Sequence, residues 1–320
     1  NHNILLPDKQ AQELAKESEG WISAIVLTSH ALWHGGLDSL FGAKASGTSV
    51  FDFLAAEVFD SQPPRIRSFL LASSVLSEFT AEQCAEFCGD ADAPALLKQL
   101  EEANLFLNLI GDRWYRYHNL FREFLVQRLK ETDSRAYAEL NARAAKLAAE
   151  RGDWDQVVNH YLRAGLVDEA ARVIEARAEA LIEGGQWDTV LQWTEPLLKT
   201  PAADRPAIKL ARAQSLIYRG GGEEPHRLAS EAVDSLRSTG DSAAIARALV
   251  ARSLVLRARG RYRDAVADCE EALALARDDD ALSLEVHKQL GACLGQQGKF
   301  AEAVAVLERA LSLSRRLFRE

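Results

Sequence analysis

Cysteine and histidine are the residue types in this sequence that could act as nucleophiles or ligate a metal ion. Cys84 and Cys88 are four residues apart, which would place both side chains on one face of a helix. A structural zinc site needs four ligands, and no second Cys or His pair lies nearby in the sequence. The seven histidines are dispersed along the chain. We therefore interpret all four cysteines (Cys84, Cys88, Cys269 and Cys293) as reduced, buried thiols.

Phosphate chemistry would require a loop of the form G-x-x-x-x-G-K-[ST], whose backbone N–H groups cradle the phosphates. The Gly298-Lys299 pair lacks the upstream glycine and is followed by Phe300. The signatures of dinucleotide-binding folds, zinc proteases and serine hydrolases are also missing from the sequence. The sequence therefore predicts a binding module that is not an enzyme and that holds no metal or other cofactor by itself.

Composition restricts the classes of partner further. Hydrophobic residues make up 48% and charged residues 27% of the 320 residues, as in ordinary folded proteins. The formal net charge of -9 disfavours direct nucleic-acid binding, because that binding depends on an excess of Lys and Arg. We found no apolar run of about 20 residues that would span a membrane and no signal-peptide pattern. The expected location is the cytoplasm.

A repeated pattern of Gly-x-aromatic followed by a small or aliphatic residue organises the second half of the chain. The glycine gives a turn its positive φ, and the aromatic side chain fills the gap between two helices. The first two units are 33 residues apart and the last two 38, close to the 34 residues of tetratricopeptide repeats (TPRs), and the middle gap of 75 residues is about twice that. The pattern occurs at Gly152/Trp154, Gly185/Trp187, Gly260/Tyr262 and Gly298/Phe300, with a degenerate unit at Gly220-Gly221-Gly222.

Residues 50–132 show a different pattern, of short helices separated by clear breaks. Pro63-Pro64 and Pro94 open helices, and Thr80 with Gln83 has the spacing of a capping box. Residues 105–110 and 114–117 are β-prone runs around a Gly-Asp turn, followed by a helix over about 118–130.

The predicted fold class is all-α. We expect a winged-helix module with a small two-stranded wing over residues 50–132 and a TPR-like helical-repeat superhelix over residues 133–320. Residues 1–49 are expected to form two short helices and a linker.

Several segments of the first half resemble the winged-helix region of MalT-like, ATP-dependent transcriptional regulators. The most specific is WYRYHNLFREFL, from Trp114 to Leu125. The others are FDFLAAEVF (51–59), QPP (62–64), FLL (69–71), SVL (74–76) and NLF (104–106). Gly20-Trp21 is similar to the helical end of that family's nucleotide-binding domain.

The resemblance implies a signal-transduction ATPase with numerous domains, ADP-bound and closed at rest. It implies that an inducer docks on the repeats and that the intact protein then becomes ATP-bound and oligomeric. Residues 1–49 would be a remnant of the nucleotide-binding domain, which would also be a partner of this region. His118 would contact the nucleotide phosphates, and only in the intact protein. The output domain that follows could be a LuxR-type DNA-binding domain or another effector.

Stacked helical hairpins form a superhelix whose concave surface is lined by the first helix of each pair. We expect this surface to bind a small polar or anionic inducer, or an acidic protein segment, because its side chains include hydrogen-bond donors and positive charges. The residues projected there are Gln214, Tyr218, Arg247, Arg257, Lys288 and Gln296. On the alternative interpretation, these arginines, like neighbouring Arg252, only solvate helix surfaces and pair with acids such as Asp264.

Two functions remain open on this evidence. The first is a regulatory, ligand-sensing region in which the winged helix couples nucleotide state to the inducer-binding repeats. The second is a stand-alone TPR-like scaffold for protein–protein interaction. Direct DNA binding by the winged helix is disfavoured because residues 80–88 contain Glu82 and Glu86 but no Lys or Arg.

Overall fold

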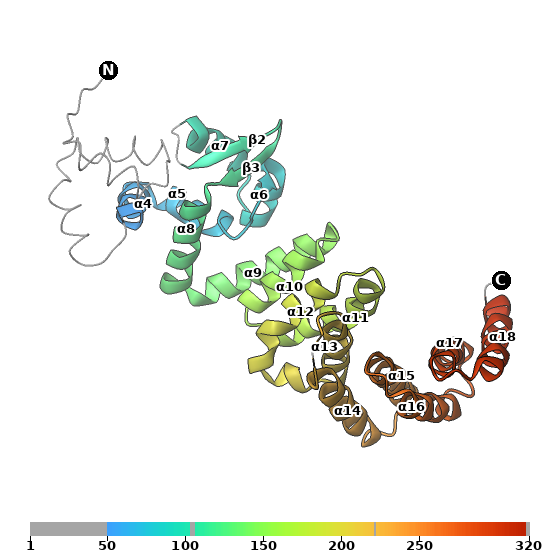
Figure 1. The fold of residues 1–320 in the computed structure, drawn as a ribbon. Helices are drawn as coiled ribbons and strands as arrows, with labels where there is room; N and C mark the ends of the chain where they lie inside the picture. The colour runs from blue at the N-terminus through green and yellow to red at the C-terminus, as the bar shows by residue number, and fades with distance from the viewer. Residues whose placement is uncertain (1–49, 103–105, 221, 318–320) are drawn as a thin grey trace, which may run out of the picture. The chain divides into compact units, whose positions relative to one another are not determined.

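The computed structural model describes residues 50–102, 106–220 and 222–317 (Figure 1). Their contacts separate two units, with the division after Leu147. The helices and linker predicted for residues 1–49 lie outside the described residues. The domain boundary predicted after residue 132 stays a prediction.

The first unit has the elements of a winged helix, which confirms the predicted class of this region. It also contains a short strand before the second predicted helix, which the sequence did not reveal. Its elements are α4 (Val50–Asp60), α5 (Pro64–Ser73), β1 (Phe79–Thr80), α6 (Ala81–Cys88), α7 (Ala93–Glu102), β2 (Leu107–Ile110), β3 (Trp114–Tyr117), α8 (Asn119–Thr132) and α9 (Ser134–Glu150).

The three strands form an antiparallel sheet in the order β1-β3-β2. Phe79 pairs with Tyr115, and Leu107 pairs with Tyr117. The predicted capping box at the start of α6 is present. The backbone N–H of Gln83 donates to Thr80 Oγ1, and the backbone N–H of Thr80 donates to Gln83 Oε1. Local sequence signals therefore fix the start of α6, while β1 forms by pairing with a strand far along the chain.

Tyr117 lies at the centre of the first unit's core and is fully buried. Its ring packs against Phe79 and Phe121. The phenol oxygen is 2.7 Å from Ser73 Oγ, so the one polar atom of the ring has a hydrogen-bond partner inside the core. This hydrogen bond links the hairpin strand β3 to helix α5.

The second unit is helical throughout its described residues. Its elements are α10 (Trp154–Arg163), α11 (Val167–Glu183), α12 (Trp187–Thr194), two short 3₁₀ helices (Glu195–Lys199 and Pro201–Asp204), α13 (Pro206–Tyr218), α14 (Glu224–Arg237), α15 (Ser242–Ala258), α16 (Tyr262–Leu275), α17 (Asp280–Gln296) and α18 (Phe300–Leu317). None of the helices in the described part of the chain is long and apolar enough to cross a membrane.

The last six helices form three hairpins, α13/α14, α15/α16 and α17/α18, which follow one another along the chain (Figure 1). The turn glycines Gly260 and Gly298 have φ of 71° and 77°, as the repeat pattern predicts. The first helices α13, α15 and α17 contact one another in that order, and each later first helix also packs on the second helix before it. The TPR-like prediction is confirmed.

Gly291 allows α17 and α18 to approach closely. A Cβ atom at this position would lie 2.6 Å from the Leu307 side chain. At Gly295, one turn further along α17, a Cβ atom would meet nothing within 4 Å. Gly291 is therefore tightly packed against α18, whereas Gly295 on the same helix has free space beside it.

Replacing Gly291 by Val should separate the last hairpin and lower the free energy of unfolding by about 1–3 kcal/mol, because the added atoms overfill a close helix contact. The matched control Gly295→Ala should leave stability unchanged or raise it by up to about 1 kcal/mol, since alanine favours helix. Urea denaturation followed by far-UV circular dichroism measures both. Equal stability of the two variants would contradict the close contact.

Candidate functional site

The structure places the six residues predicted for ligand binding on three neighbouring helices, α13, α15 and α17. We call these six residues the first-helix set. Four of them are exposed and two, Gln214 and Arg257, are half-buried. Gln214 and Tyr218 lie on α13, Arg247 and Arg257 on α15, and Lys288 and Gln296 on α17.

The two arginines of the set have no acidic partner among the described residues. Arg247 is exposed and forms neither an ion pair nor a hydrogen bond with any residue that the structure describes. The Nε atom of Arg257 is buried and makes no hydrogen bond within the described residues. Lys288, in contrast, forms an ion pair with Glu285 at 2.7 Å. Neither arginine pairs with Asp264, which accepts from Arg261, and the interpretation that they only solvate helix surface stays untested.

Tyr218 offers an aromatic surface at the end of α13. Its ring stacks on Trp187 with centroids 4.6 Å apart and an interplanar angle of 14°. More than half of the Tyr218 surface stays exposed. The stacking fixes the orientation of the ring while leaving one face available to a ligand.

An open hollow of about 610 Å³ lies where the turns of the last two hairpins meet, and Gln296 is part of its wall. Arg261 and Lys299 contribute positive charge there, and Asp264 contributes negative charge. Arg261 donates to Asp264 at 2.7 Å, and Lys299 to Glu302 at 3.3 Å. The charges of this hollow are thus largely satisfied within the protein.

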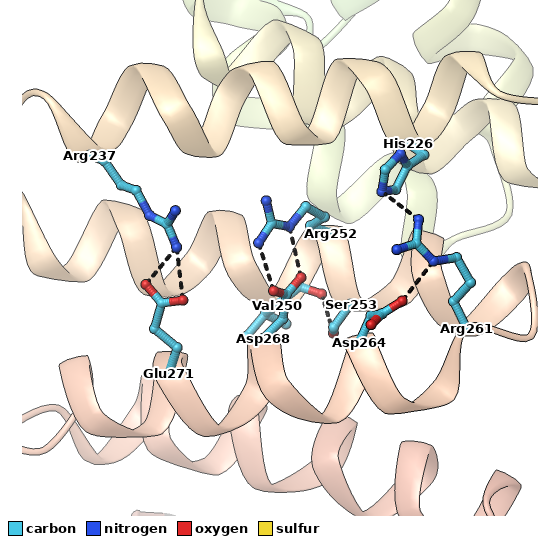
Figure 2. A network of polar contacts seen from close by, with 9 residues as sticks. All are labelled: His226, Arg237, Val250, Arg252, Ser253, Arg261, Asp264, Asp268 and Glu271. Atoms are coloured by element: carbon cyan, nitrogen blue, oxygen red, sulfur yellow. Dashed lines mark hydrogen bonds and ion pairs between the residues drawn. The ribbon is translucent and has the colours of Figure 1, made fainter.

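A row of polar contacts joins α14, α15 and α16 (Figure 2). Arg237 of α14 donates to both carboxylate oxygens of Glu271 on α16, each at 2.8 Å. At the other end of the row, Arg261 NH1 lies 3.2 Å from His226 Nε2. Because arginine is a donor only, His226 accepts this bond as a neutral imidazole.

Arg252 and Asp268 form the centre of the row, and their contact is the most buried ion pair of the repeats. Arg252 Nε and NH2 donate to the two oxygens of Asp268 at 2.8 and 2.7 Å, with side-chain exposures of 16% and 8%. The bond to Asp268 raises the pKa of Arg252 although burial opposes it. Sequence reasoning took Arg252 for a surface arginine. Arg252 and Asp268 are sixteen residues apart, on opposite sides of one hairpin turn, so no local sequence pattern indicates that they pair.

His118 precedes α8 at its N-terminus, where the resemblance placed it. Burial, together with Arg116, lowers the pKa of this half-buried ring. One imidazole without a phosphate-binding loop is not a nucleotide site, because phosphate binding depends on several converging N–H donors. The proposed contact with ATP or ADP therefore stays a prediction for the intact protein.

The described residues of α6 and α7 form no cationic face on the winged helix. Glu82 and Glu86 are exposed on α6, and Lys98 of α7 lies 3.8 Å from Glu102. The Sγ atoms of Cys84 and Cys88 are 3.9 Å apart, and the described residues contain no group of three potential metal ligands.

Comparison with known proteins agrees with this architecture. Residues 55–137 match the family model of the MalT winged helix domain, and residues 244–316 match that of a tetratricopeptide repeat. The class is therefore a winged-helix protein with a TPR region, a repeat type typical of interaction domains.

Three relatives illustrate the relationship. The serine/threonine-protein kinase PknK of Mycobacterium tuberculosis is 31% identical over 214 residues, covering 66% of this chain and 19% of the kinase. The HTH-type transcriptional regulator MalT of Klebsiella pneumoniae is 22% identical over 318 residues, covering 96% of this chain and 35% of MalT. A signal-transduction ATPase with a TPR sensor from Pyrococcus horikoshii has 15% identity and a TM-score of 0.39, covering 82% of this chain and 52% of that chain.

The chain therefore contains a region that matches the MalT winged helix domain, followed by a tetratricopeptide-repeat region. It spans about a fifth of the length of the kinase relative and about a third of the MalT relative.

Removing one partner of the buried Arg252–Asp268 pair should strongly destabilise the repeats. We expect Asp268→Ala to cost about 3 kcal/mol, because it leaves a buried guanidinium without its counter-charge. The matched change Glu271→Ala, in the half-exposed pair with Arg237, should cost less than about 1 kcal/mol. Guanidinium denaturation of the two variants measures the difference. Similar midpoints would show that the pair is not desolvated.

Acid should weaken the repeats through His226. Burial and the charges of Arg261, Arg259 and Arg252 lower the pKa of this ring, and Glu223 only partly compensates. Between the folded pKa and the ordinary value of about 6.5, the unfolded chain binds more protons, so stability falls as pH drops through this window.

Comparing urea midpoints of the wild type and His226→Gln at pH values of about 7.5 and 5.5 tests this effect. The loss on acidification should be smaller in the variant, by less than about 1 kcal/mol because solvent screens the half-buried ring. Identical losses would assign the pH dependence to other groups.

Proposed function

We propose that this chain is the regulatory, ligand-sensing region of an ATP-dependent transcriptional regulator. In this proposal the repeats bind an effector and the winged helix couples effector binding to the nucleotide state of the parent protein. The match of residues 55–137 to the MalT winged helix and the similarity to MalT along 96% of the chain support the assignment.

The observation that carries the binding role is the pair of arginines on α15 without acidic partners. Several other arginines of the repeats have acidic partners, such as Arg237 with Glu271 and Arg227 with Glu231. Arg247 and the Nε atom of Arg257 have no such bonds among the described residues. A half-buried guanidinium nitrogen without a hydrogen bond gains free energy when an anionic group reaches it.

The positions of these residues also bear on the size of the ligand. Arg247 and Arg257 are ten residues apart on one helix, which corresponds to about 15 Å along its axis. A single ligand that reaches both must be about as long as an extended peptide of five residues. Carboxylates would suit the two guanidinium groups, and the amides of Gln214 and Gln296 would suit a peptide backbone. We therefore favour an extended acidic peptide or protein segment over a small inducer.

Titration of the chain with fluorescent peptide pools rich in Asp and Glu tests this function. We expect micromolar binding that weakens as salt is added, because the attraction is electrostatic. The double change Arg247→Ala and Arg257→Ala should weaken binding at least about tenfold. The control Arg227→Ala with Arg237→Ala removes the same charge from α14 and should change affinity less than about twofold.

Equal losses in the two double variants would mean that only overall charge attracts the peptides. Failure of every acidic pool to bind would reject the peptide-binding role. Circular dichroism of each variant separates these results from unfolding.

The second candidate is a repeat scaffold that is not part of a transcriptional regulator, and the 31% identity to the kinase PknK favours it. The two candidates differ in what the intact polypeptide contains. Mass mapping of the intact protein that shows a phosphate-binding loop ahead of residue 1 supports the regulator, and its absence from that protein supports the scaffold.

A further inference from the structure

The open hollow of about 610 Å³ lies between the turns of the last two hairpins. Residues 260–264 form one part of its wall, and Gln296, Gln297 and Lys299 form the other. Its volume is within the range of about 300–1,000 Å³ that is typical of small-molecule sites. The described residues of the wall include no aliphatic side chain. A ligand in this hollow would therefore be held by charge and by hydrogen bonds.

The wall of the hollow is positively charged in a protein whose net charge is -9. Arg261, Arg263 and Lys299 line it together with one acid, Asp264, so the wall has a formal charge of +2. The sequence before Asp264 concentrates this charge, because residues 242–263 contain six arginines and no Asp or Glu. The acids that pair with these arginines come from other segments, and they do not reach all of them.

Arg263 has no acidic partner in the described part of the chain. It is exposed and forms neither an ion pair nor a hydrogen bond with any residue there. Arg261 and Lys299 do have partners, Asp264 at 2.7 Å and Glu302 at 3.3 Å, but all four side chains are about half exposed. Exposed ion pairs of this kind contribute little, so an incoming anion can share both cations.

We propose that the hollow binds a phosphomonoester, which is a phosphate group on a small polar molecule. The phosphate carries a charge of about -1.5 to -2 at pH 7, which matches the wall, whereas a carboxylate carries a single charge. Its three terminal oxygens accept hydrogen bonds from Arg261, Arg263 and Lys299. This site is independent of the proposed peptide-binding role, with which it shares only Gln296.

The remaining wall residues suit a polar body on the phosphate. The side-chain amides of Gln296 and Gln297 form no hydrogen bond with any described residue, so each can both donate to and accept from a ligand. Tyr262 is half-buried and adds an aromatic ring with a hydroxyl group to the same hollow. A body with hydroxyl groups or ring heteroatoms therefore fits better than a hydrocarbon.

Calorimetric titration of the whole chain with ribose 5-phosphate, AMP, phosphoserine and inorganic phosphate tests the proposal. At least one organic phosphate should bind with a dissociation constant on the order of 0.1–1 mM, and more weakly as salt is added. Ribose, adenosine and serine should not bind, because they lack the dianion. Inorganic phosphate should bind more weakly than the best organic phosphate, and the ranking identifies the body.

The double change Arg263→Ala with Lys299→Ala should weaken that binding at least about fivefold. The control Arg277→Ala with Arg172→Ala removes the same charge elsewhere in the second unit and should change affinity less than about twofold. Arg277 is exposed without an ion pair among the described residues, as Arg263 is, and Arg172 pairs with an acid three residues away, as Lys299 does.

Three results would overturn the proposal. The first is that no phosphate binds at concentrations up to about 10 mM. The second is an equal loss in the two double variants, which would mean that overall charge alone attracts the anions. The third is that inorganic phosphate binds as tightly as every organic phosphate, which would mean that the wall holds no polar body. Circular dichroism confirms that each variant is folded.

Discussion

The repeats depend on one constraint, which is that a helical hairpin cannot bury its apolar surface alone. Each second helix needs the first helix of the following hairpin across its exposed face. Val233 on α14 and Cys269 on α16 become fully buried in this way. The turn glycines and the small residues Ala272, Gly291 and Ala310 keep the helices close enough for that contact. The arrangement is set by neighbours and needs no central core.

This constraint gives the two helices of a hairpin different roles. The second helices carry apolar contacts and contribute Arg237, Asp268 and Glu271 to the polar row of Figure 2, while Arg252 of that row lies on α15. The first helices contact one another along α13, α15 and α17. Their remaining side chains are not needed for stacking, so their chemistry can vary with the ligand while the scaffold stays intact.

Structural features that depend on a few adjacent residues could be predicted from the sequence. Features that depend on contacts between distant residues could not. The capping box of Thr80, the Gly-Asp hairpin turn and the repeat glycines are local, and all three occur in the structure. Strand β1 has two residues, too short for a pattern, and exists only by pairing with β3. The partner of Arg252 depends on how two helices align. The repeat pattern assigned the first-helix set to the first helices, where α13, α15 and α17 carry it, but it did not predict that Arg257 Nε would be buried without a bond.

Because each hairpin contacts only its neighbours, the contacts of the second unit join residues that are close in sequence. Chains with such short contact separations fold rapidly, since little loop entropy is lost before a contact forms. A hairpin such as α13/α14 can fold while later residues are still being translated. The next hairpin then packs against one that is already folded. The region is therefore suited to vectorial folding on the ribosome, where its exposed apolar surface stays limited to the newest helix.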